Sequence, residues 1–201
     1  MVPGRRRILS KNAALYAPES AVPHLFRIEQ GVIRLCLYML DGQRVIVRLA
    51  FPGDLVGLID GQHKLAAEAV TSVIVMEWSF GEDDGATEQR IRLLSIAMRQ
   101  AYLALAIRSR PRARARVAAF LLELAARGLN TEFRLPLGDL AEHLGVTIHT
   151  ISRTLTEFGR TGVLRRISGQ VFVINKIDRL REIAFGGSKA VSEPHLPAST
   201  G

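Results

Sequence analysis

The sequence lacks paired cysteines. Its 201 residues include one cysteine, Cys36. A single cysteine excludes an internal disulfide, and it cannot by itself hold an iron–sulfur cluster or a structural zinc ion. Because Cys36 lies in the apolar run VIRLCLYML, we expect it to be a buried strand residue.

The sequence also lacks long hydrophobic runs. No stretch approaches the roughly 20 apolar residues of a membrane span, and the basic start, MVPGRRRILSKN, is not followed by the hydrophobic core of a signal peptide. The chain has no Gly-rich phosphate loop, no nucleophile elbow and no His/Cys cluster with metal-ligand spacing. These absences indicate a cytoplasmic protein that is neither an enzyme nor a metalloprotein.

Acidic residues are scarce in the second half of the chain. The net charge is +8 and the pI about 10.5, which favours a polyanionic partner. Residues 1–109 hold 13 Lys/Arg and 11 Asp/Glu, whereas residues 110–185 hold 13 and 7. The surplus positive charge is therefore concentrated in residues 110–185.

Residues 1–84 have the pattern of short strands. The segments RIEQGVIRLCLYML, RVIVRLAF and AAEAVTSVIVMEWS are rich in Val, Ile and Leu. Asp41-Gly42 is a hairpin signal because glycine accepts positive φ at little cost, and Phe51–Asp54 is a second turn. This spacing predicts an antiparallel β-roll or barrel.

A helix is predicted from about Thr87 to Arg108. A heptad-like seam runs along it, formed by Ile91, Leu94, Met98, Ala101 and Leu105. Leu93, Ile96, Leu103 and Ile107 form a second apolar face. Two apolar faces favour a dimerisation helix over 85–109 that packs on its own roll and on a partner. The alternative is a single buried core helix.

A further helix follows a junction near Ser109–Arg110. Pro111 suits its first turn and Gly128 its C-terminal cap. Five arginines stand at alternate positions from 108 to 116, and alternate positions turn by about 200° on a helix, so they do not form one stripe. Whether each contacts phosphate, protein groups or only solvent stays open.

Residues 137–162, LGDLAEHLGVTIHTISRTLTEFGRTG, are the most informative stretch. Two helical segments flank a break at Gly145–Thr147. Ala141, Gly145 and Ile151 stand where a helix-turn-helix needs a small residue, a turn residue and a core aliphatic. The second segment presents His149, Ser152 and Arg153 on one face, which indicates reading of DNA in the major groove.

The flanking segments predict a winged form of this motif. Phe133–Leu135 has the pattern of a short strand before it, and VLRRI and QVFVIN form a hairpin around Ser168-Gly169. Asn175 is the predicted cap of a last helix, KIDRLREIAF. We therefore predict a winged helix-turn-helix domain over 110–185 and a mobile tail over 186–201.

The order of a β-roll, a long helix and a winged helix-turn-helix resembles the Crp/Fnr family of bacterial transcription regulators. The resemblance spans roughly residues 12–184. It is carried by LPLGDLAEHLGVTIHTISRTLTEFGRTGVLRR and by DGQRVIVRLAFPGDLVGL. TISRTLTEF is nearest the Fnr/FixK branch, since a glycine usually stands in place of Ser152 in the cyclic-AMP branch. The resemblance implies an α+β fold with a cyclic-nucleotide-binding-like jelly roll, a homodimer on a near-palindromic operator, and contact with RNA polymerase.

The resemblance also implies the DNA contacts. In the Fnr-like branch a Glu, a Ser and an Arg read bases; Ser152 and Arg153 match the last two, and His149 stands in place of the glutamate. Thr147 is the expected helix cap and a phosphate ligand. Arg165 and Arg166, at the start of the wing, are expected to contact phosphates as well.

The roll lacks the residues by which the family recognises known effectors. The stretch GLIDGQHKLAAEAVTS, where the cyclic-nucleotide branch holds its phosphate, has no arginine. The N-terminal cysteines of the oxygen-sensing branch are absent. We therefore expect no cofactor. The alternative is a ligand- or haem-responsive sensor, with His24, His63 or Cys36 as axial ligands and a winged helix that contacts protein.

Overall fold

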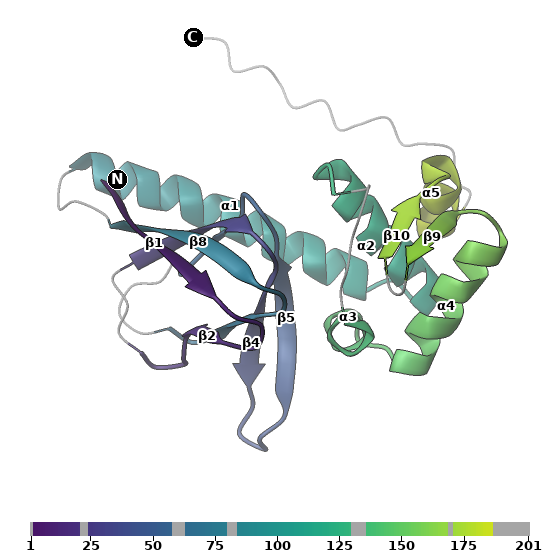
Figure 1. The fold of residues 1–201 in the computed structure, drawn as a ribbon, viewed down its shortest axis with the longest axis horizontal. Coiled ribbons are helices and arrows are strands. Elements are labelled where there is room, and N and C mark those ends of the chain that lie inside the picture. The colour runs from purple at the N-terminus through teal and green to yellow at the C-terminus, as the bar shows by residue number, and fades with distance from the viewer. Residues whose placement is uncertain are drawn as a thin grey trace, which may run out of the picture. The chain divides into compact units, whose positions relative to one another are not determined.

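The N-terminal strands form the two antiparallel sheets of a roll (Figure 1). The structure, a computed structural model, describes residues 2–20, 24–57, 63–79, 84–129, 136–168 and 171–186. One sheet has the order β1 (Val2–Leu9), β8 (Val73–Ser79), β3 (His24–Gln30), β6 (Leu55–Val56). The other has the order β2 (Ala14–Tyr16), β7 (Ala66–Ala69), β4 (Ile33–Tyr38), β5 (Arg44–Ala50). The predicted antiparallel roll is confirmed, although β1 and β2 were not expected.

The core of the roll lies between the two sheets. Alternate side chains of a strand point to opposite faces, so one face of each sheet can be apolar while the other carries charge. On β4, for example, Ile33 and Leu35 are buried while Arg34 between them is half-buried. The predicted placement of Cys36 is confirmed, because its side chain is fully buried. The buried cluster comprises Leu9, Leu15, Tyr16, Phe26, Ile28, Ile33, Leu35, Ala50, Val56, Ala67, Ala69, Val73 and Val75.

The hairpin between β4 and β5 has the predicted tight turn. Gly42 has φ +81°, a conformation that favours glycine. The side chain of Asp41 accepts a hydrogen bond from the Gln43 amide at 2.9 Å. The hairpin extends beyond the rest of the sheet (Figure 1), and its tip residues Met39 and Leu40 are exposed. The hairpin therefore presents apolar side chains to solvent.

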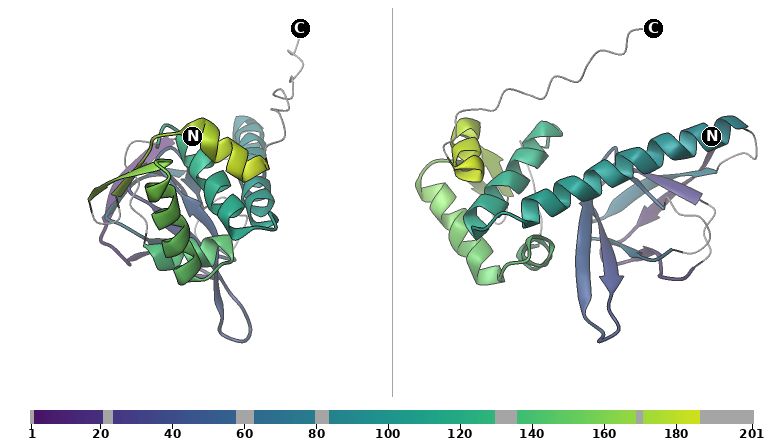
Figure 2. Two further views of the ribbon diagram at one scale, coloured as in Figure 1. Left: turned by 90° about the vertical axis from the view of Figure 1, so that its right-hand side faces the viewer. Right: turned by 180° about the vertical axis from the view of Figure 1, so that it is seen from behind.

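Helix α1 (Asp84–Arg108) is a continuous 25-residue helix that runs along the roll (Figure 2). It begins three residues before the predicted start at Thr87. Gln100 donates a hydrogen bond to Asp54 at 2.8 Å, and Ile107 is buried. The predicted second apolar face is only partly right, because Ile96 and Leu103 are exposed. The face toward the roll is instead formed by small and polar residues, including Ala97, Gln100 and Ala104.

The five predicted seam residues of α1 all lie on its exposed surface. Ile91 is 58%, Met98 55% and Leu105 64% exposed, and Leu94 and Ala101 are exposed too. An apolar row of this length on a single chain is typical of a surface that a partner covers. The alternative of a buried core helix is excluded by these exposures.

The chain divides into two compact units. One comprises Met1–Ser109 with Leu135–Ile151, and the other Arg110–Arg134 with Ser152–Gly201. The break after Ser109 falls at the predicted junction. The prediction placed all of 110–185 in one domain, whereas Leu135–Ile151 groups with the roll. Helix α3 (Leu137–Leu144) of this segment packs against β5, and ion pairs from β4 and β5 reach the same helix.

The second unit is built on two packed helices. Helix α2 (Ala113–Ala126) packs against α5 (Ile177–Phe185), and α2 buries Val117, Phe120, Leu121 and Leu124. The hairpin of β9 (Leu164–Ser168) and β10 (Val171–Ile174) confirms the predicted wing.

One prediction for this unit is wrong, and others fall on residues that the structure does not describe. Asn175 does not cap α5: its side-chain amide donates to the Gly162 carbonyl at 3.2 Å, and Lys176 occupies the N-cap position. The predicted strand Phe133–Leu135, Gly169 of the wing turn and the tail beyond Gly186 lie outside the described residues.

No helix among the described ranges is long and apolar enough to cross a membrane.

Candidate nucleic-acid interface

The helix-turn-helix is closed by a left-handed glycine. Helix α3 (Leu137–Leu144) ends at Gly145, whose φ and ψ are 64° and 45°. The amide of Val146 then donates to the Ala141 carbonyl at 3.0 Å, which satisfies a carbonyl that the helix end leaves free. Ala141 is buried. The predicted turn and small-residue position are both confirmed.

Thr147 caps the next helix, as predicted. Helix α4 (Ile148–Arg160) starts directly after it. The Thr147 hydroxyl accepts a hydrogen bond from the Thr150 amide at 3.2 Å, which is the usual interaction of an N-cap threonine. The remaining free amides and the helix dipole make this end of α4 attractive to an anion.

Helix α4 has one buried and one exposed face. Ile151, Leu155 and Phe158 are buried, which confirms the first two as core residues. His149, Ser152 and Arg153 are exposed, and we call them the reading face. Within the described part of the chain, the Arg153 side chain makes no ion pair. The reading face is thus available for an external partner.

The exposed face of α4 extends further than the sequence prediction. Thr156 and Arg160 are also exposed. Thr156 stands four residues after Ser152, and Arg160 stands seven residues after Arg153. Residues at these spacings share one side of a helix, so periodicity alone was a sufficient signal. The Thr156 hydroxyl donates to the Ser152 carbonyl at 2.9 Å.

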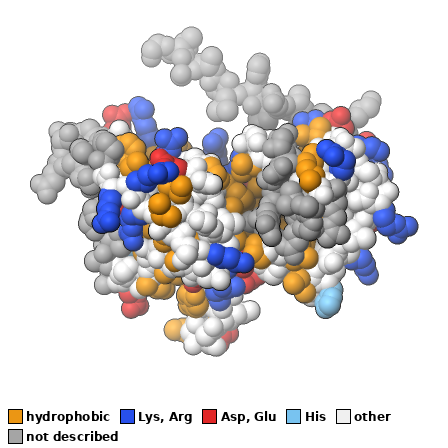
Figure 3. Space-filling view, in the orientation of Figure 1, with side chains coloured by type: hydrophobic (Ala, Val, Ile, Leu, Met, Phe, Trp, Pro, Cys, Tyr) orange, Lys and Arg blue, Asp and Glu red, His pale blue; other side chains and the backbone are white. Residues whose placement is uncertain are grey.

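The wing carries two of the residues that were predicted to contact DNA phosphates, Arg165 and Arg166. Arg165 on β9 is exposed and lies opposite Val173 of β10. The side chain of Arg166 is outside the described part, so its predicted role stays a prediction. On the face shown in Figure 3, Lys and Arg side chains lie over the region that carries α4 and α5 in Figure 1 and also over the roll.

Three of the five arginines around the α1–α2 junction bind protein groups. Arg110 donates to the Ala184 carbonyl and lies over the Phe185 ring. Arg114 pairs with Glu157 at 3.0 Å. The Nε of Arg116 donates to the Arg110 carbonyl at 2.7 Å. These arginines therefore hold the second unit together, which the sequence alone left open.

A five-residue ion cluster joins α3 to the roll. It consists of Arg34, Arg44, Glu68, Asp139 and Glu142. Arg34 pairs with Glu68 at 2.8 Å and with Asp139 at 3.0 Å. Arg44 pairs with Glu142 at 2.8 Å. The sequence did not predict this cluster, because its members come from three strands of one sheet, β4, β5 and β7, and from a helix far along the chain.

His143, which follows Glu142 on α3, is buried. Its Nδ1 donates to the Ile46 carbonyl on β5 at 3.4 Å. Burial lowers the pKa of His143 from 6.5 to about 4; the Ile46 hydrogen bond opposes this effect and the nearby positive charge of Arg108 adds to it. His143 is therefore neutral in the folded protein at physiological pH.

The lowered pKa of His143 predicts a loss of stability in mild acid. The unfolded chain takes up the proton as the pH falls through about 6.5, whereas the folded chain resists it until about 4, so the free energy of unfolding falls by about 3 kcal/mol across that window. His143→Gln keeps an amide donor for Ile46 and cannot titrate. Chemical denaturation between pH 7 and 4 should show a shallower decline for His143→Gln than for the wild type; equal declines would contradict the assignment.

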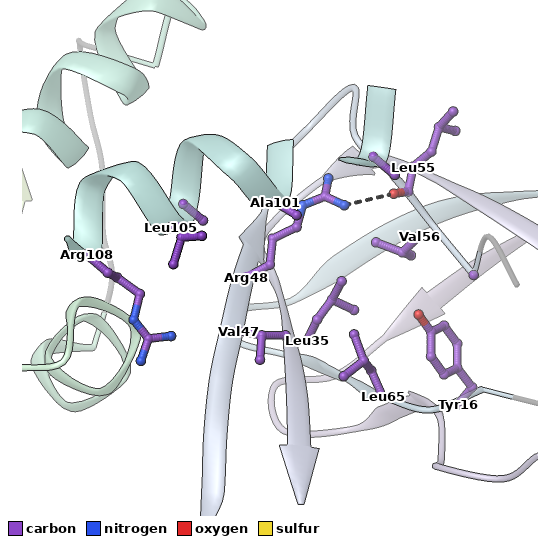
Figure 4. Close-up of a pocket in the computed structure, with 13 residues that line it drawn as sticks. Tyr16, Leu35, Val47, Arg48, Leu55, Val56, Leu65, Ala101, Leu105 and Arg108 are labelled. Atoms are coloured by element: carbon purple, nitrogen blue, oxygen red, sulfur yellow. Dashed lines mark hydrogen bonds between the residues drawn. The ribbon is translucent and has the colours of Figure 1, made fainter. Parts of the chain in front are cut away.

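A cavity of about 360 Å³ lies in the roll beside α1. Figure 4 shows Leu35, Val47 and Leu65 converging on it. Arg48 is one of the two cationic residues that line the cavity. The Arg48 guanidinium pairs with Asp54 at 3.3 Å and donates a hydrogen bond to the Leu55 carbonyl at 3.5 Å (Figure 4). The full lining is Tyr16, Leu35, Val47, Arg48, Leu55, Val56, Gly57, Leu65, Ala97, Ala101, Ala104, Leu105 and Arg108. The wall is thus mainly aliphatic.

Two of the candidate haem ligands, His63 and Cys36, lie outside the cavity lining. The His63 ring is buried and stacked on the Tyr16 ring, 3.7 Å between centroids, and burial lowers the pKa of His63. Neither His63 nor Cys36 lines the cavity, and the side chain of His24 is outside the described part. Burial raises the pKa of Cys36 to about 11. Among the described residues, no group of three or more His, Cys, Asp or Glu could hold a metal ion.

Comparison with known proteins places this geometry among bacterial regulators. Residues 115–183 match the model of the Crp-like helix-turn-helix domain. The chain is 32% identical over 187 residues to the nitrogen fixation regulation protein FixK of Bradyrhizobium diazoefficiens, covering 86% of this chain and 79% of the relative. It is 29% identical to the fumarate and nitrate reduction regulatory protein of Escherichia coli, covering 90% and 78%.

The fold comparison agrees. The solved structure of FixK2 from Bradyrhizobium japonicum superposes with a TM-score of 0.82 at 25% identity, covering 91% of this chain and 98% of that chain. The predicted family resemblance, nearest the Fnr/FixK branch, is therefore confirmed.

Proposed function

Because the chain belongs to the Crp/Fnr family of DNA-binding transcription regulators, we propose that it acts as a homodimer on a near-palindromic operator and is neither an enzyme nor a cyclic-nucleotide receptor. The observation that carries the proposal is the reading face of α4, which is exposed directly opposite a fully buried core face. Two such helices about 34 Å apart would enter successive major grooves.

The exposed seam of α1 supports the dimer. Ile91, Met98 and Leu105 recur every seven residues and are each more than half exposed. Packing this row, with Leu94 and Ala101, against the same row of a second copy removes apolar surface from water and satisfies the twofold symmetry of the operator.

The reading face supports specific recognition. Arg153 has two N–H donors for O6 and N7 of guanine, a contact worth about 1–3 kcal/mol of discrimination. Ser152 can approach a base edge or a thymine methyl group. His149 can accept a hydrogen bond from cytosine N4 or donate one to guanine. We therefore expect this operator to differ from those of the Fnr/FixK branch at the base that His149 faces.

Phosphate contacts support affinity. Thr147 at the start of α4 and Arg165 on the wing are exposed, and Arg166 completes the proposed set. Neutralisation of phosphates releases counterions, so binding should weaken steeply with salt. Protein–DNA contacts of this kind position the reading face but carry no base preference.

RNA polymerase is the proposed partner for activation. The tip of the β4–β5 hairpin offers Tyr38, Met39 and Leu40, which are exposed although apolar. Exposed apolar groups of this kind are typical of a protein contact. As a DNA-binding regulator, the protein would meet the polymerase in the cytoplasm.

We propose that no cofactor or cyclic nucleotide controls the protein, which is then regulated mainly by its abundance. The aliphatic cavity wall and the pairing of Arg48 with Asp54 support this view. Recognition of a cyclic nucleotide phosphate is expected to use an arginine guanidinium that pairs with the phosphate instead of with a carboxylate. The burial of His63 against Tyr16 likewise disfavours its use as a haem ligand.

Selection of bound duplexes from a random pool tests the proposal. Performed without and with cyclic AMP, it should return one near-palindromic sequence that is the same in both arms. Half-site centres should lie one helical turn apart. Enrichment only with cyclic AMP would overturn ligand independence, and no enrichment in either arm would overturn operator recognition.

The rival function is a sensor whose winged helix contacts protein. Residues 110–185 carry 13 Lys/Arg against 7 Asp/Glu, and Arg153 is left without an ion pair in the described structure, both of which favour DNA. Titration of duplex DNA at several salt concentrations separates the two functions. A steep linear fall of log K with log salt is expected for DNA binding; salt-independent, negligible binding would favour the rival.

A further inference from the structure

The ion cluster at the base of the helix-turn-helix is nearly buried at the Arg34–Asp139 pair and partly exposed at the Arg44–Glu142 pair. The Nη1 of Arg34 donates to both carboxylate oxygens of Asp139, at 3.0 and 3.2 Å. These side chains are 12% and 8% exposed. Arg44 donates to the two oxygens of Glu142 at 3.3 and 2.8 Å. Two arginines of the roll therefore hold two carboxylates on one helix, three residues apart.

Within the roll, Arg34 is held by Glu68 of the neighbouring strand. Arg34 lies directly opposite Glu68 in the β4–β7 ladder, and its Nε donates to Glu68 at 2.8 Å. The Tyr38 hydroxyl donates to the other oxygen of Glu68 at 2.8 Å. Burial by itself raises the pKa of Glu68, but the hydrogen bonds from Tyr38 and Arg34 outweigh it and hold the pKa below its usual value. Glu68 stays charged and fixes the guanidinium of Arg34 toward α3.

The orientation of α3 is coupled to the orientation of the first turn of α4. The two helices are joined by Gly145–Thr147, and this turn is closed by the bond from the Val146 amide to Ala141. The Ile151 amide then donates to the Thr147 carbonyl at 3.1 Å, in the first turn of α4. A rotation of α3 would therefore rotate the start of α4 with it.

The docked position of α3 leaves the reading face open. The cluster uses Asp139 and Glu142, while His149, Ser152 and Arg153 remain exposed. An inhibitory contact would have to cover the reading face. The ion cluster instead holds α3 in one orientation while the reading face of α4 stays exposed to a partner.

We propose that Arg34 and Arg44 are positioning residues for DNA recognition: by holding Asp139 and Glu142 of α3, they fix the orientation in which α4 meets the operator. The inference rests on the proposed function of α4. An intact buried ion pair adds little net stability compared with an apolar pair, whereas loss of one partner is destabilising. The directed hydrogen bonds of the cluster hold α3 in one orientation, so we expect an effect on operator binding in addition to any effect on stability.

A double-mutant cycle tests the proposal. The variants are Arg34→Met, Asp139→Asn and the double variant, measured as dimers by titration of operator and of random duplex. Arg34→Met should lower operator affinity about tenfold and the operator-to-random ratio by nearly as much, a size typical of coupled pairs. The double variant should bind no worse than Arg34→Met, because both changes break the same contact.

The salt slope separates positioning from phosphate contact. Arg34 touches no DNA in this proposal, so Arg34→Met should leave the slope of log K against log salt unchanged, whereas loss of a phosphate contact reduces it. Arg6→Met is the matched control, since Arg6 pairs with the strand residue Glu29 and is 57% exposed. Its operator affinity should equal that of the wild type.

A merely structural role predicts another result. In that case Arg34→Met lowers the unfolding temperature but leaves the operator-to-random ratio unchanged, or the cycle is additive, and the inference is overturned. If Arg34→Met does not fold, Arg44→Met with Glu142→Gln supplies the same cycle at a more exposed pair. If the wild type and Arg6→Met show no operator preference, the proposed function itself has failed.

Discussion

Replacement of Arg153 by alanine should abolish discrimination at one base pair of each half-site. The side chain is exposed on α4, so its removal leaves no cavity and no unpaired buried charge. The loss of a bidentate contact to guanine costs about 1–3 kcal/mol per half-site. Since the proposed dimer loses the contact twice, operator affinity should fall by roughly two orders of magnitude or more.

The measurement is a comparison of operator and random duplexes at one salt concentration. Arg153→Ala should lose far more affinity for the operator than for random DNA, and substituted operators should reveal a single relaxed position. Arg181→Ala is the matched control, because Arg181 is 61% exposed and pairs with Asp178 on α5. An equal loss for both duplexes would show that Arg153 contacts phosphate only.

Replacement of Met98 by glutamate should dissociate the dimer. Met98 lies in the middle of the seam and is 55% exposed on the single chain. In a symmetric coiled-coil contact the two glutamates would face each other within the apolar row. Because the two DNA-binding heads would then act separately, the gain from effective concentration is lost, and operator affinity should fall about 10²–10⁴-fold.

Sedimentation and operator titration check this result together. The variant should sediment as a monomer of unchanged secondary structure. Leu103→Glu is the matched control, because Leu103 is 47% exposed on the same helix but away from the seam, so that variant should remain a dimer. A dimeric Met98→Glu protein would falsify the seam.

Periodicity and turn chemistry were sufficient to predict most of the fold. The αL glycine at Gly145, the Thr147 cap and the buried Ile151 follow local rules of short range. They therefore appear in the sequence and in the structure alike. Helix α1 follows from its apolar spacing in the same way, although its first three residues were missed.

The errors arise where two signals compete or where contacts are distant. Asn175 is a good cap by propensity, yet its side chain finds the Gly162 carbonyl from the neighbouring turn. Ile96 and Leu103 look like a packing face, but small residues let α1 approach the roll on another side. The pairing of Arg34 with Asp139 joins residues 105 positions apart, and no local rule predicts it.

The separation of faces on α4 has a consequence for how such regulators diverge. Ile151, Leu155 and Phe158 form the buried face of the helix, while His149, Ser152 and Arg153 are exposed. Surface substitutions usually change stability by less than about 0.5 kcal/mol. After gene duplication, a copy could therefore acquire a different operator by changes at these three positions without first gaining spare stability, which makes the helix a suitable place to engineer regulators that ignore one another's promoters.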